Sequence, residues 1–578
     1  MKNYDTKNIR NICFVGHGGS GKTSLAETFL FNSGVINRIG KITDGNTVSD
    51  YLPEEIQRHI SISTSLIPIE HMGIKINVLD TPGYSDFIGE VISALRVVET
   101  GALILCGVSG VEVQSQIVWD MMDERQLPRI VFINKLDREN SNAEKVLDQL
   151  KLNFLDARFV QMQIPVGKEA DFEGVVDILQ SNIPDRFKDD VEMLKEALTE
   201  AAAEADDEIL MKYLEGESLE VNELKVIIQK ALAQNMIVPV LFGSSEKNIG
   251  VKEFIQFVAD YVPAPTPIEQ KAALIFKTLA DPYLGKMTFF RVFGGTFIGE
   301  SIAYNSTREV EEKMGQLFYL RGKNQENTPN VQPGDIAVVA KLQETKTGDT
   351  FSAKDKPIVL EGIKFPLPCL PLSVRPKSKG DEDKLGSALA RLVDEDPTIS
   401  VGKNTETKQT ILSGLGEMQL DIVSEKLARK FGVAVETEVP RVPYRETIKK
   451  QVQVEGKHKK QSGGHGQYGH VWIRMEPNPE SDFEFTEEVF GGSVPKNYFP
   501  AVEKGLREAI AEGFLAGYPM TNVKFTLYDG SYHSVDSSEM AFKLAAILAF
   551  KKGAEQAGAV LMEPVVEAEN KDSRSIYG

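Results

Sequence analysis

Short apolar runs alternate with segments of helical periodicity over the first half of the chain. The apolar runs predict buried strands at residues 74–79, 102–106, 129–133 and 237–242. Apolar positions at helical spacing predict helices at residues 86–97, 115–125 and 251–262. This alternation predicts a doubly wound α/β domain over residues 8–265, with ligands bound at the carboxyl ends of the strands.

The pattern changes on both sides of a proline-rich linker at residues 262–267. Before the linker, charged helical stretches at about 168–235 predict a solvated insertion in the first domain. After it, β-branched and aromatic runs broken by glycines predict a β-barrel domain over residues 270–362. The order of strands and helices over residues 366–440 predicts a ferredoxin-like α/β domain.

Composition narrows the class of protein. The 578 residues leave room for about four domains, and 42% hydrophobic with 26% charged residues is typical of a soluble globular protein. No apolar run approaches the roughly 20 residues of a membrane span, and the N-terminus lacks the apolar core of a secretion signal. We therefore expect a cytoplasmic protein without a membrane partner. The settings of Cys13, Cys106 and Cys369 argue against a disulfide framework or a zinc site.

A glycine-rich turn lies between an expected strand at residues 12–15 and an expected helix at residues 22–31. It consists of Gly16, His17, Gly18, Gly19, Ser20, Gly21, Lys22 and Thr23. Glycines let backbone N–H groups close around phosphate oxygens, Lys22 can reach the outer phosphates, and the Thr23 hydroxyl can bind Mg²⁺. The alternative is a chance glycine-rich turn, but the flanking strand and helix favour a phosphate-binding P-loop.

A second motif follows the expected strand at residues 74–79. It reads Asp80-Thr81-Pro82-Gly83. Asp80 can hold Mg²⁺, directly or through water, and the Gly83 N–H can sense a terminal phosphate. Such a turn is commonplace by itself, and it gains weight from its position after a strand of a P-loop domain.

A third motif, Asn134-Lys135-Leu136-Asp137, follows the expected strand at residues 129–133. The Asp137 carboxylate can accept from the two N–H donors on the guanine edge, and Asn134 can bond the acceptors of that base. Adenine presents no matching pair of donors, so the motif predicts GTP rather than ATP. Ser244 and Ser245 follow the last expected strand and complete the guanine-binding set with Lys135. An ordinary capped turn is the alternative.

The order and spacing of these motifs resemble those of elongation factor G, a ribosome-dependent translational GTPase. The resemblance extends over nearly the whole chain. It implies two segments that respond to the terminal phosphate, switch I at about residues 43–62 and switch II at residues 80–89. It also implies that Ser61 is a Mg²⁺ ligand with Thr23 and Asp80, and that the ligands are GTP or GDP with Mg²⁺.

Two departures from the family concern the reaction. Tyr84 stands where the family has a histidine that positions the attacking water, and Ser61 stands where it usually has threonine. A tyrosine hydroxyl can bond water but cannot become cationic, whereas an imidazole can. We therefore expect Lys22, Gly83 and Tyr84 to act in catalysis, with GTP binding intact and hydrolysis slower or differently triggered.

A basic glycine-rich segment lies between residues 457 and 470, in a chain whose net charge of −19 disfavours indiscriminate nucleic-acid binding. Alone, such a charged run is usually a solvated face. The resemblance implies the fourth domain of elongation factor G over residues 441–562, with this segment and His533 at a tip beside tRNA and mRNA. The expected RNA-contacting residues are Lys459, Lys460, Ser462, Gly463, Gly464, His465, Gly466, Gln467, Tyr468 and His533. Asp536 and Glu539 predict a capping box for the next helix.

The leading hypothesis is a monomeric, ribosome-dependent GTPase that promotes movement of tRNA and mRNA during elongation. A paralogue that acts on the ribosome in protection or regulation is the second reading, because of Tyr84 and because residues 563–578 resemble only the start of a truncated fifth domain. A GTP-binding module without catalysis is the third.

Overall fold

The computed structural model describes residues 2–180, 182–215, 217, 219–281, 284–461 and 466–565. The chain forms two compact units, Met1–Lys403 with Thr410–Val439, and Asn404–Gln409 with Pro440–Gly578. Among the described residues, no helix has the length and apolar character that a membrane crossing requires.

A seven-stranded sheet forms the centre of the first unit, in the order β2-β3-β1-β4-β5-β9-β6. Its strands are β1 (Ile9–Val15), β2 (Ser65–His71), β3 (Ile74–Asp80), β4 (Thr100–Cys106), β5 (Arg129–Asn134), β6 (Phe159–Gln161) and β9 (Val238–Phe242). All neighbours pair in parallel except β2, which runs antiparallel to β3 at one edge. The predicted doubly wound domain is confirmed, whereas β2 and β6 were not predicted.

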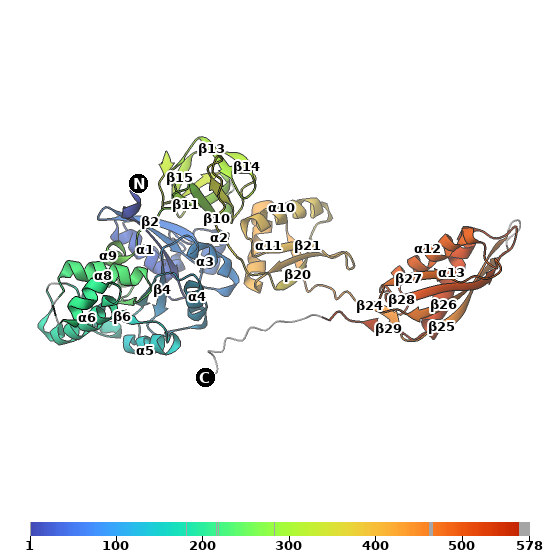
Figure 1. Ribbon diagram of the computed structural model, residues 1–578, viewed down its shortest axis with the longest axis horizontal. Helices are drawn as coiled ribbons and strands as arrows, with labels where there is room; N and C mark the ends of the chain where they lie inside the picture. Colours follow the sequence, from blue (N-terminus) through green and yellow to red (C-terminus); the bar gives the residue numbers. More distant parts are fainter. Residues whose placement is uncertain are drawn as a thin grey trace. The chain divides into compact units, whose positions relative to one another are not determined.

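Helices cover both faces of this sheet (Figure 1). On one face lie α1 (Lys22–Asn32), α9 (Val251–Tyr261) and the insertion helices α6 (Lys188–Ala203) and α8 (Val221–Ala233). On the other lie α3 (Ile88–Leu95), α4 (Val113–Glu124) and α5 (Ala143–Asn153). The insertion also contains α7 (Asp207–Leu214) and follows a hairpin of β7 (Gln163–Val166) and β8 (Gly174–Asp177).

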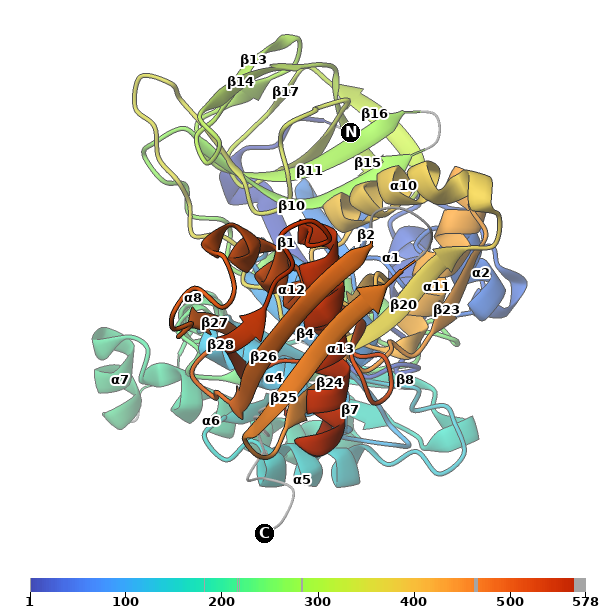
Figure 2. The same cartoon turned by 90° about the vertical axis from the view of Figure 1, so that its right-hand side faces the viewer.

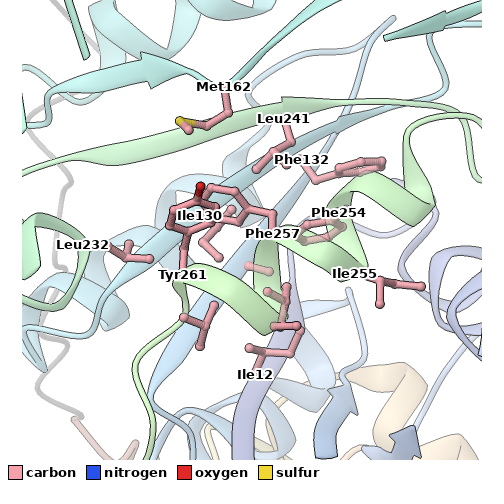
Figure 3. Close-up of a cluster of buried hydrophobic side chains, with 14 of the residues drawn as sticks. Ile12, Ile130, Phe132, Met162, Leu232, Leu241, Phe254, Ile255, Phe257 and Tyr261 are labelled. Atoms are coloured by element: carbon pink, nitrogen blue, oxygen red, sulfur yellow. The ribbon is translucent and has the colours of Figure 1, made fainter. Parts of the chain in front are cut away.

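Aromatic packing fixes α9 against the sheet. Phe254 of α9 stacks on Phe132 of β5 with ring centroids 4.8 Å apart, and its ring meets Phe29 of α1 edge-on at 5.5 Å. Figure 3 shows Phe132 and Phe254 among aliphatic side chains from several elements. This core holds α1, and therefore the P-loop that precedes it, in a fixed position relative to the strands.

An antiparallel sheet forms the β-barrel domain, in the order β14-β13-β19-β10-β11-β18-β15-β16. Its strands are β10 (Ala272–Asp281), β11 (Gly285–Gly294), β13 (Ser301–Asn305), β14 (Val310–Met314), β15 (Leu317–Arg321), β16 (Asn324–Thr328), β18 (Ile336–Ala340) and β19 (Thr350–Ser352). A separate pair is formed by β12 (Phe297–Ile298) and β17 (Asn330–Val331). Side chains of β10 and β11 enter the same buried cluster as those of α3, so the barrel packs directly on the first domain.

The last part of the first unit has the expected ferredoxin-like order. It consists of β20 (Leu370–Pro376), α10 (Glu382–Glu395), β21 (Ser400–Lys403), β22 (Thr410–Gly414), α11 (Glu417–Phe431) and β23 (Val435–Glu438). The strands form one antiparallel sheet in the order β21-β22-β20-β23.

The second unit contains a four-stranded sheet with two helices on one face (Figure 2). Its elements are β25 (Val452–Lys460), β26 (Gln467–Pro477), β27 (Phe483–Glu487), α12 (Phe499–Glu512), β28 (Val523–Ser531) and α13 (Glu539–Gln556). A two-stranded sheet joins β24 (Arg445–Ile448) to β29 (Ala559–Met562). Of residues 563–578, only 563–565 are described, and they form no helix or strand.

The predicted capping box before α13 is wrong. Ser538 is the N-cap residue, and its side chain accepts from the Ala541 N–H at 3.2 Å. Asp536 instead accepts from the Gly466 N–H at 2.9 Å. Its carboxylate is used to join two loops and not to begin the helix.

Candidate functional site

The P-loop connects β1 to α1 and wraps around the Lys22 side chain. Lys22 Nζ donates to the backbone oxygens of Gly16 and His17, both at 2.9 Å. Gly16 has a φ of +140°, which L side chains rarely adopt, and a Cβ there would lie 2.4 Å from the Ile104 backbone oxygen. Burial lowers the pKa of Lys22 to about 8. The loop is a tight backbone cradle with an amine at its inner side.

Three oxygen-bearing side chains meet beside the P-loop, from α1, the end of β3 and switch I. Thr23 Oγ1 donates to Asp80 Oδ2 at 2.9 Å and lies 3.0 Å from Ser61 Oγ. Burial raises the pKa of Asp80 to about 6. Asp80 Oδ1 is buried and has no hydrogen-bond partner among the described residues. A hard cation would satisfy this oxygen, so the three residues fit Mg²⁺.

Asp50 is a site residue that the sequence motifs did not indicate. It is buried in switch I and lines the same cavity as Lys22 and Thr23. Burial, together with the charge of Asp80, raises its pKa to about 7. Because the Asp50 and Asp80 carboxyls are both buried and close enough to interact, they favour the binding of a cation there. The only sequence signal for Asp50 is its position inside the expected switch I.

Gly83 and Tyr84, which the sequence predicts to respond to a terminal phosphate, lie against the P-loop. A Cβ at Gly83 would lie 2.5 Å from Lys22 Nζ and 2.6 Å from the Gly18 nitrogen. A Cβ at Gly18 would lie 3.1 Å from the Tyr84 ring. Only glycine therefore fits at position 83, and Tyr84 covers the loop where the outer phosphates would lie.

The residues predicted to bind the base are also brought together. Asn134 Nδ2 donates to the Ser20 oxygen at 3.0 Å and to Ser245 Oγ at 3.1 Å, while the Ser245 N–H donates to Asn134 Oδ1 at 2.9 Å. Lys135 Nζ reaches the Gly19 oxygen. Asp137 Oδ1 is buried without a hydrogen-bond partner among the described residues, which suits an acceptor for a base edge.

A cavity of about 380 Å³ lies beside these groups, although Asp80, Asn134 and Asp137 are not among its lining residues. Residues from the P-loop, both switches and the base-binding loops line it, and they include Lys22, Thr23, Ser61, Tyr84, Lys135 and Ser245. Its volume lies in the range of small-molecule and cofactor pockets, which is roughly 300–1,000 Å³. The cavity at the carboxyl ends of β1, β3 and β5 is thus where the sequence predicts a ligand.

One helix outside this domain contacts both switches. The N-cap of α11 is Gly416, which has no side chain, and Asp86 of switch II accepts from the Met418 and Gln419 N–H groups at 3.0 and 3.4 Å. An ion pair to Glu425 at 2.6 Å connects Arg58 of switch I to the same helix. No sequence motif indicated these contacts.

The expected RNA-contacting residues form part of a tip in the second unit. Lys459 and Lys460 at the end of β25 pair with Tyr468 and Gln467 of β26. Residues 462–465, which include four of the expected contacts, lie outside the described residues.

The second tip segment, which contains His533, joins the first through side chains and backbone. The Tyr468 hydroxyl lies 2.7 Å from Ser531 Oγ, and the Tyr468 N–H donates to the Asp536 oxygen at 2.8 Å. His533 Nδ1 accepts from the Val535 and Asp536 N–H groups at 3.3 and 3.1 Å, and its side chain is exposed. The described tip residues therefore form one connected surface.

Comparisons with known proteins cover almost the whole chain. Family models match in order: the elongation factor Tu GTP binding domain at residues 7–264, and elongation factor G domain 2 at 270–354, domain III at 365–439 and domain IV at 440–558. Elongation factor G of Thermotoga maritima is 40% identical over 98% of this chain and 87% of its own length, and that of Thermotoga petrophila matches equally. The chain belongs to the elongation factor G family.

A solved structure also matches nearly the whole chain. A crystal structure of a Thermus thermophilus protein matches with a TM-score of 0.84 and 32% identity, over 96% of this chain and 86% of that one. This member of the elongation factor G family is therefore a translational GTPase that binds GTP and GDP and acts with the ribosome. The comparisons give no specific support to the alternative, a paralogue that acts in protection or regulation.

Proposed function

We propose that this elongation factor G family member hydrolyses GTP at the cavity between the P-loop and the switches. The P-loop N–H groups and Lys22 would hold the phosphates, and Asp137, with Asn134, Lys135, Ser244 and Ser245, would select guanine. The proposal rests on one observation: Thr23 lies within hydrogen-bond distance of both Asp80 and Ser61 at the edge of the P-loop. Phosphoryl transfer to water depends mainly on such positioning and on electrostatics.

We propose Thr23, Ser61 and Asp80 as the groups that hold Mg²⁺, directly or through water. Bound there, Mg²⁺ would neutralise charge on the outer phosphates. Gly83, packed against Lys22, would present its N–H to the terminal phosphate, and Tyr84 would bond the attacking water through its hydroxyl. Tyr84 is 39% exposed, so its hydroxyl can exchange partners with solvent.

The Tyr84 role can be tested by single-turnover GTP hydrolysis on ribosomes. We expect Tyr84→His to hydrolyse GTP faster than the wild type, because an imidazole can become cationic beside the developing charge. Tyr84→Phe is the matched control, because it keeps the ring against Gly18 and removes the hydroxyl. We expect this variant to hydrolyse GTP more slowly than the wild type, by a factor of up to about ten. Equal rates for all three proteins would exclude a role for Tyr84 in the reaction.

We also propose that the tip of the second unit contacts tRNA and mRNA. Lys459, Lys460, Gly466, Gln467, Tyr468 and His533, with residues 462–465, would supply cationic and hydrogen-bonding groups. The protein would work as a monomer in the cytoplasm, where its ribosome partner is found. A toeprint assay tests movement along mRNA: GTPase activity without movement would favour the regulatory alternative, which Tyr84 supports.

A further inference from the structure

A lysine of the β-barrel domain enters the neighbouring GTPase domain. Lys277 lies in β10, and its side chain is 7% exposed. Its Nζ donates to Glu90 Oε2 at 2.7 Å, to the Thr64 backbone oxygen at 2.8 Å and to Ser63 Oγ at 2.5 Å. An ammonium has three donors, and all three are used on the other domain.

The acceptors of Lys277 belong to the two segments that form the nucleotide site. Ser63 and Thr64 directly follow switch I, and Glu90 follows switch II at the beginning of α3. The Thr64 N–H also donates to Glu90 Oε2, at 2.7 Å. Lys277 and Glu90 thus connect the end of switch I to α3 by charge-assisted hydrogen bonds, which are the stronger kind.

The residues held by Lys277 lie next to the proposed metal ligand of switch I. Ser61 precedes Ser63 by two residues, and its Oγ is 3.0 Å from Thr23 Oγ1. Glu55 fixes the same backbone, because its Oε1 accepts from the Ile62 and Ser63 N–H groups at 3.1 Å. Because hydrogen bonds fix the backbone from Ile62 to Thr64, Ser61 has little freedom to move away from Thr23.

We propose that Lys277 is a positioning residue that stabilises the conformation in which Ser61 lies beside Thr23. A triphosphate with Mg²⁺ would need this conformation, whereas a diphosphate would need it less. Lys277 would therefore make the preference for GTP over GDP depend on the position of the β-barrel domain. This inference rests on the proposed function of Thr23 and Ser61.

The test measures binding of GDP and of the β,γ-imido analogue of GTP to the full chain by calorimetry in magnesium buffer. In Lys277→Met, which keeps the apolar stem and removes the ammonium, we expect analogue affinity to fall at least about tenfold and GDP affinity to change less than about twofold. Lys277→Arg, which keeps a cation, should retain part of the preference.

Lys75 offers a matched control. It is also a buried lysine between the same two domains, and its Nζ donates to both carboxylate oxygens of Asp335 at 2.8 Å. Asp335 belongs to neither switch, so Lys75→Met should leave both nucleotide affinities unchanged in folded protein. Circular dichroism identifies variants that fail to fold. If Lys277→Met fails to fold, Glu90→Gln serves as a second variant, and we expect a smaller loss of affinity for the GTP analogue.

The outcomes separate this inference from the proposed function. Failure of the wild type to bind either nucleotide would refute the proposed function itself. Wild-type binding with an equal loss of both affinities in Lys277→Met, or with no loss, would overturn the role of Lys277 alone. A loss confined to the analogue, absent from Lys75→Met, supports it.

Discussion

Glu446 anchors a loop in the second unit. The structure allows an estimate of how much more often this loop opens when Glu446 is replaced by glutamine. The Glu446 side chain is fully buried. Its Oε1 accepts from the N–H groups of Ala516, Gly517 and Tyr518 at 2.7, 3.1 and 3.3 Å, and its Oε2 from those of Phe514 and Leu515 at 2.6 and 2.9 Å. One carboxylate therefore holds five successive residues of the loop between α12 and β28.

The size of the effect follows from the number of backbone hydrogen bonds that a glutamine side chain cannot accept. Glu446→Gln keeps one oxygen and places an amino group at the other position, so at least two backbone N–H donors face a donor. An unsatisfied buried donor costs about 1–3 kcal/mol. Residues 514–517 are exposed, so water can reach a released donor and the lower value applies. Two donors then give about 2 kcal/mol, or roughly a 30-fold increase in local opening.

Hydrogen exchange with mass spectrometry measures this directly. Peptides that cover residues 514–518 should exchange about 30-fold faster in Glu446→Gln than in the wild type. Glu503→Gln is the control, because Glu503 bonds an exposed Arg507 on α12, and exchange at 514–518 should change less than about threefold. Unchanged protection of this loop in Glu446→Gln would show that the Glu446 carboxylate does not hold it closed.

The same contact predicts a dependence on pH. Burial opposes ionisation of Glu446, but the N–H groups of Ala516, Leu515 and Phe514 outweigh it and hold the pKa of this carboxyl below its usual value. A group whose pKa is lower in the folded protein stabilises it above its unfolded pKa. We therefore expect loop protection, corrected for intrinsic exchange, to be complete near neutral pH and to be lost as the pH falls below about 4. Constant protection down to about pH 2 would contradict this.

Two further changes test other parts of the first unit. Asp137→Ala should lower GTP affinity at least about tenfold in calorimetry, because hydrogen bonds to a charged group contribute about 1.5–3 kcal/mol, and unchanged affinity would remove Asp137 from the base site. Lys75→Met should lower the free energy of unfolding by about 3–5 kcal/mol, because it leaves the Asp335 carboxylate buried and unpaired, and Lys75→Met with Asp335→Leu should recover part of this in denaturant titration. A larger loss in the double variant would argue against a buried-charge effect.

The grouping of the candidate phosphate-binding and base-binding residues could be predicted from the sequence because their signals are local. The P-loop, Asp80 and Asn134 each follow a strand-like run, and in a parallel sheet the strand ends meet at one edge. The structure confirms that β1, β3 and β5 belong to one sheet and run in the same direction. Motif chemistry and strand order together were therefore sufficient to place these residues at one edge of the sheet.

Strand β2 was missed for a physical reason. It contains Pro68, which argues against a strand in most sequence patterns. In the structure β2 is an edge strand, where a missing N–H is tolerated, and the Pro68 oxygen accepts from Arg321 Nε at 3.1 Å. The cap of α13 was misassigned because Asp536 and Ser538 are both suitable caps, and only the contact of Asp536 with Gly466 decides between them.

Contacts between segments far apart in the chain carried no sequence signal at all. Lys277 reads as one polar residue of a β-rich run, and its partners Glu90 and Ser63 lie 187 and 214 residues earlier. No periodicity relates such positions, so only the packing of the barrel on α3 reveals them.

The contacts of α11 show how the two switches act on one element. An aspartate from switch II takes the place of a missing N-cap side chain at Gly416, and a Cβ there would lie 2.3 Å from Asp86 Oδ2. Farther along the helix, Arg429 bonds Glu54 at 2.6 Å beside the Arg58–Glu425 pair. Movement of either switch must therefore break a contact of α11. Because the helix also packs in the core of its own domain, these contacts connect the position of that domain to the conformation of both switches.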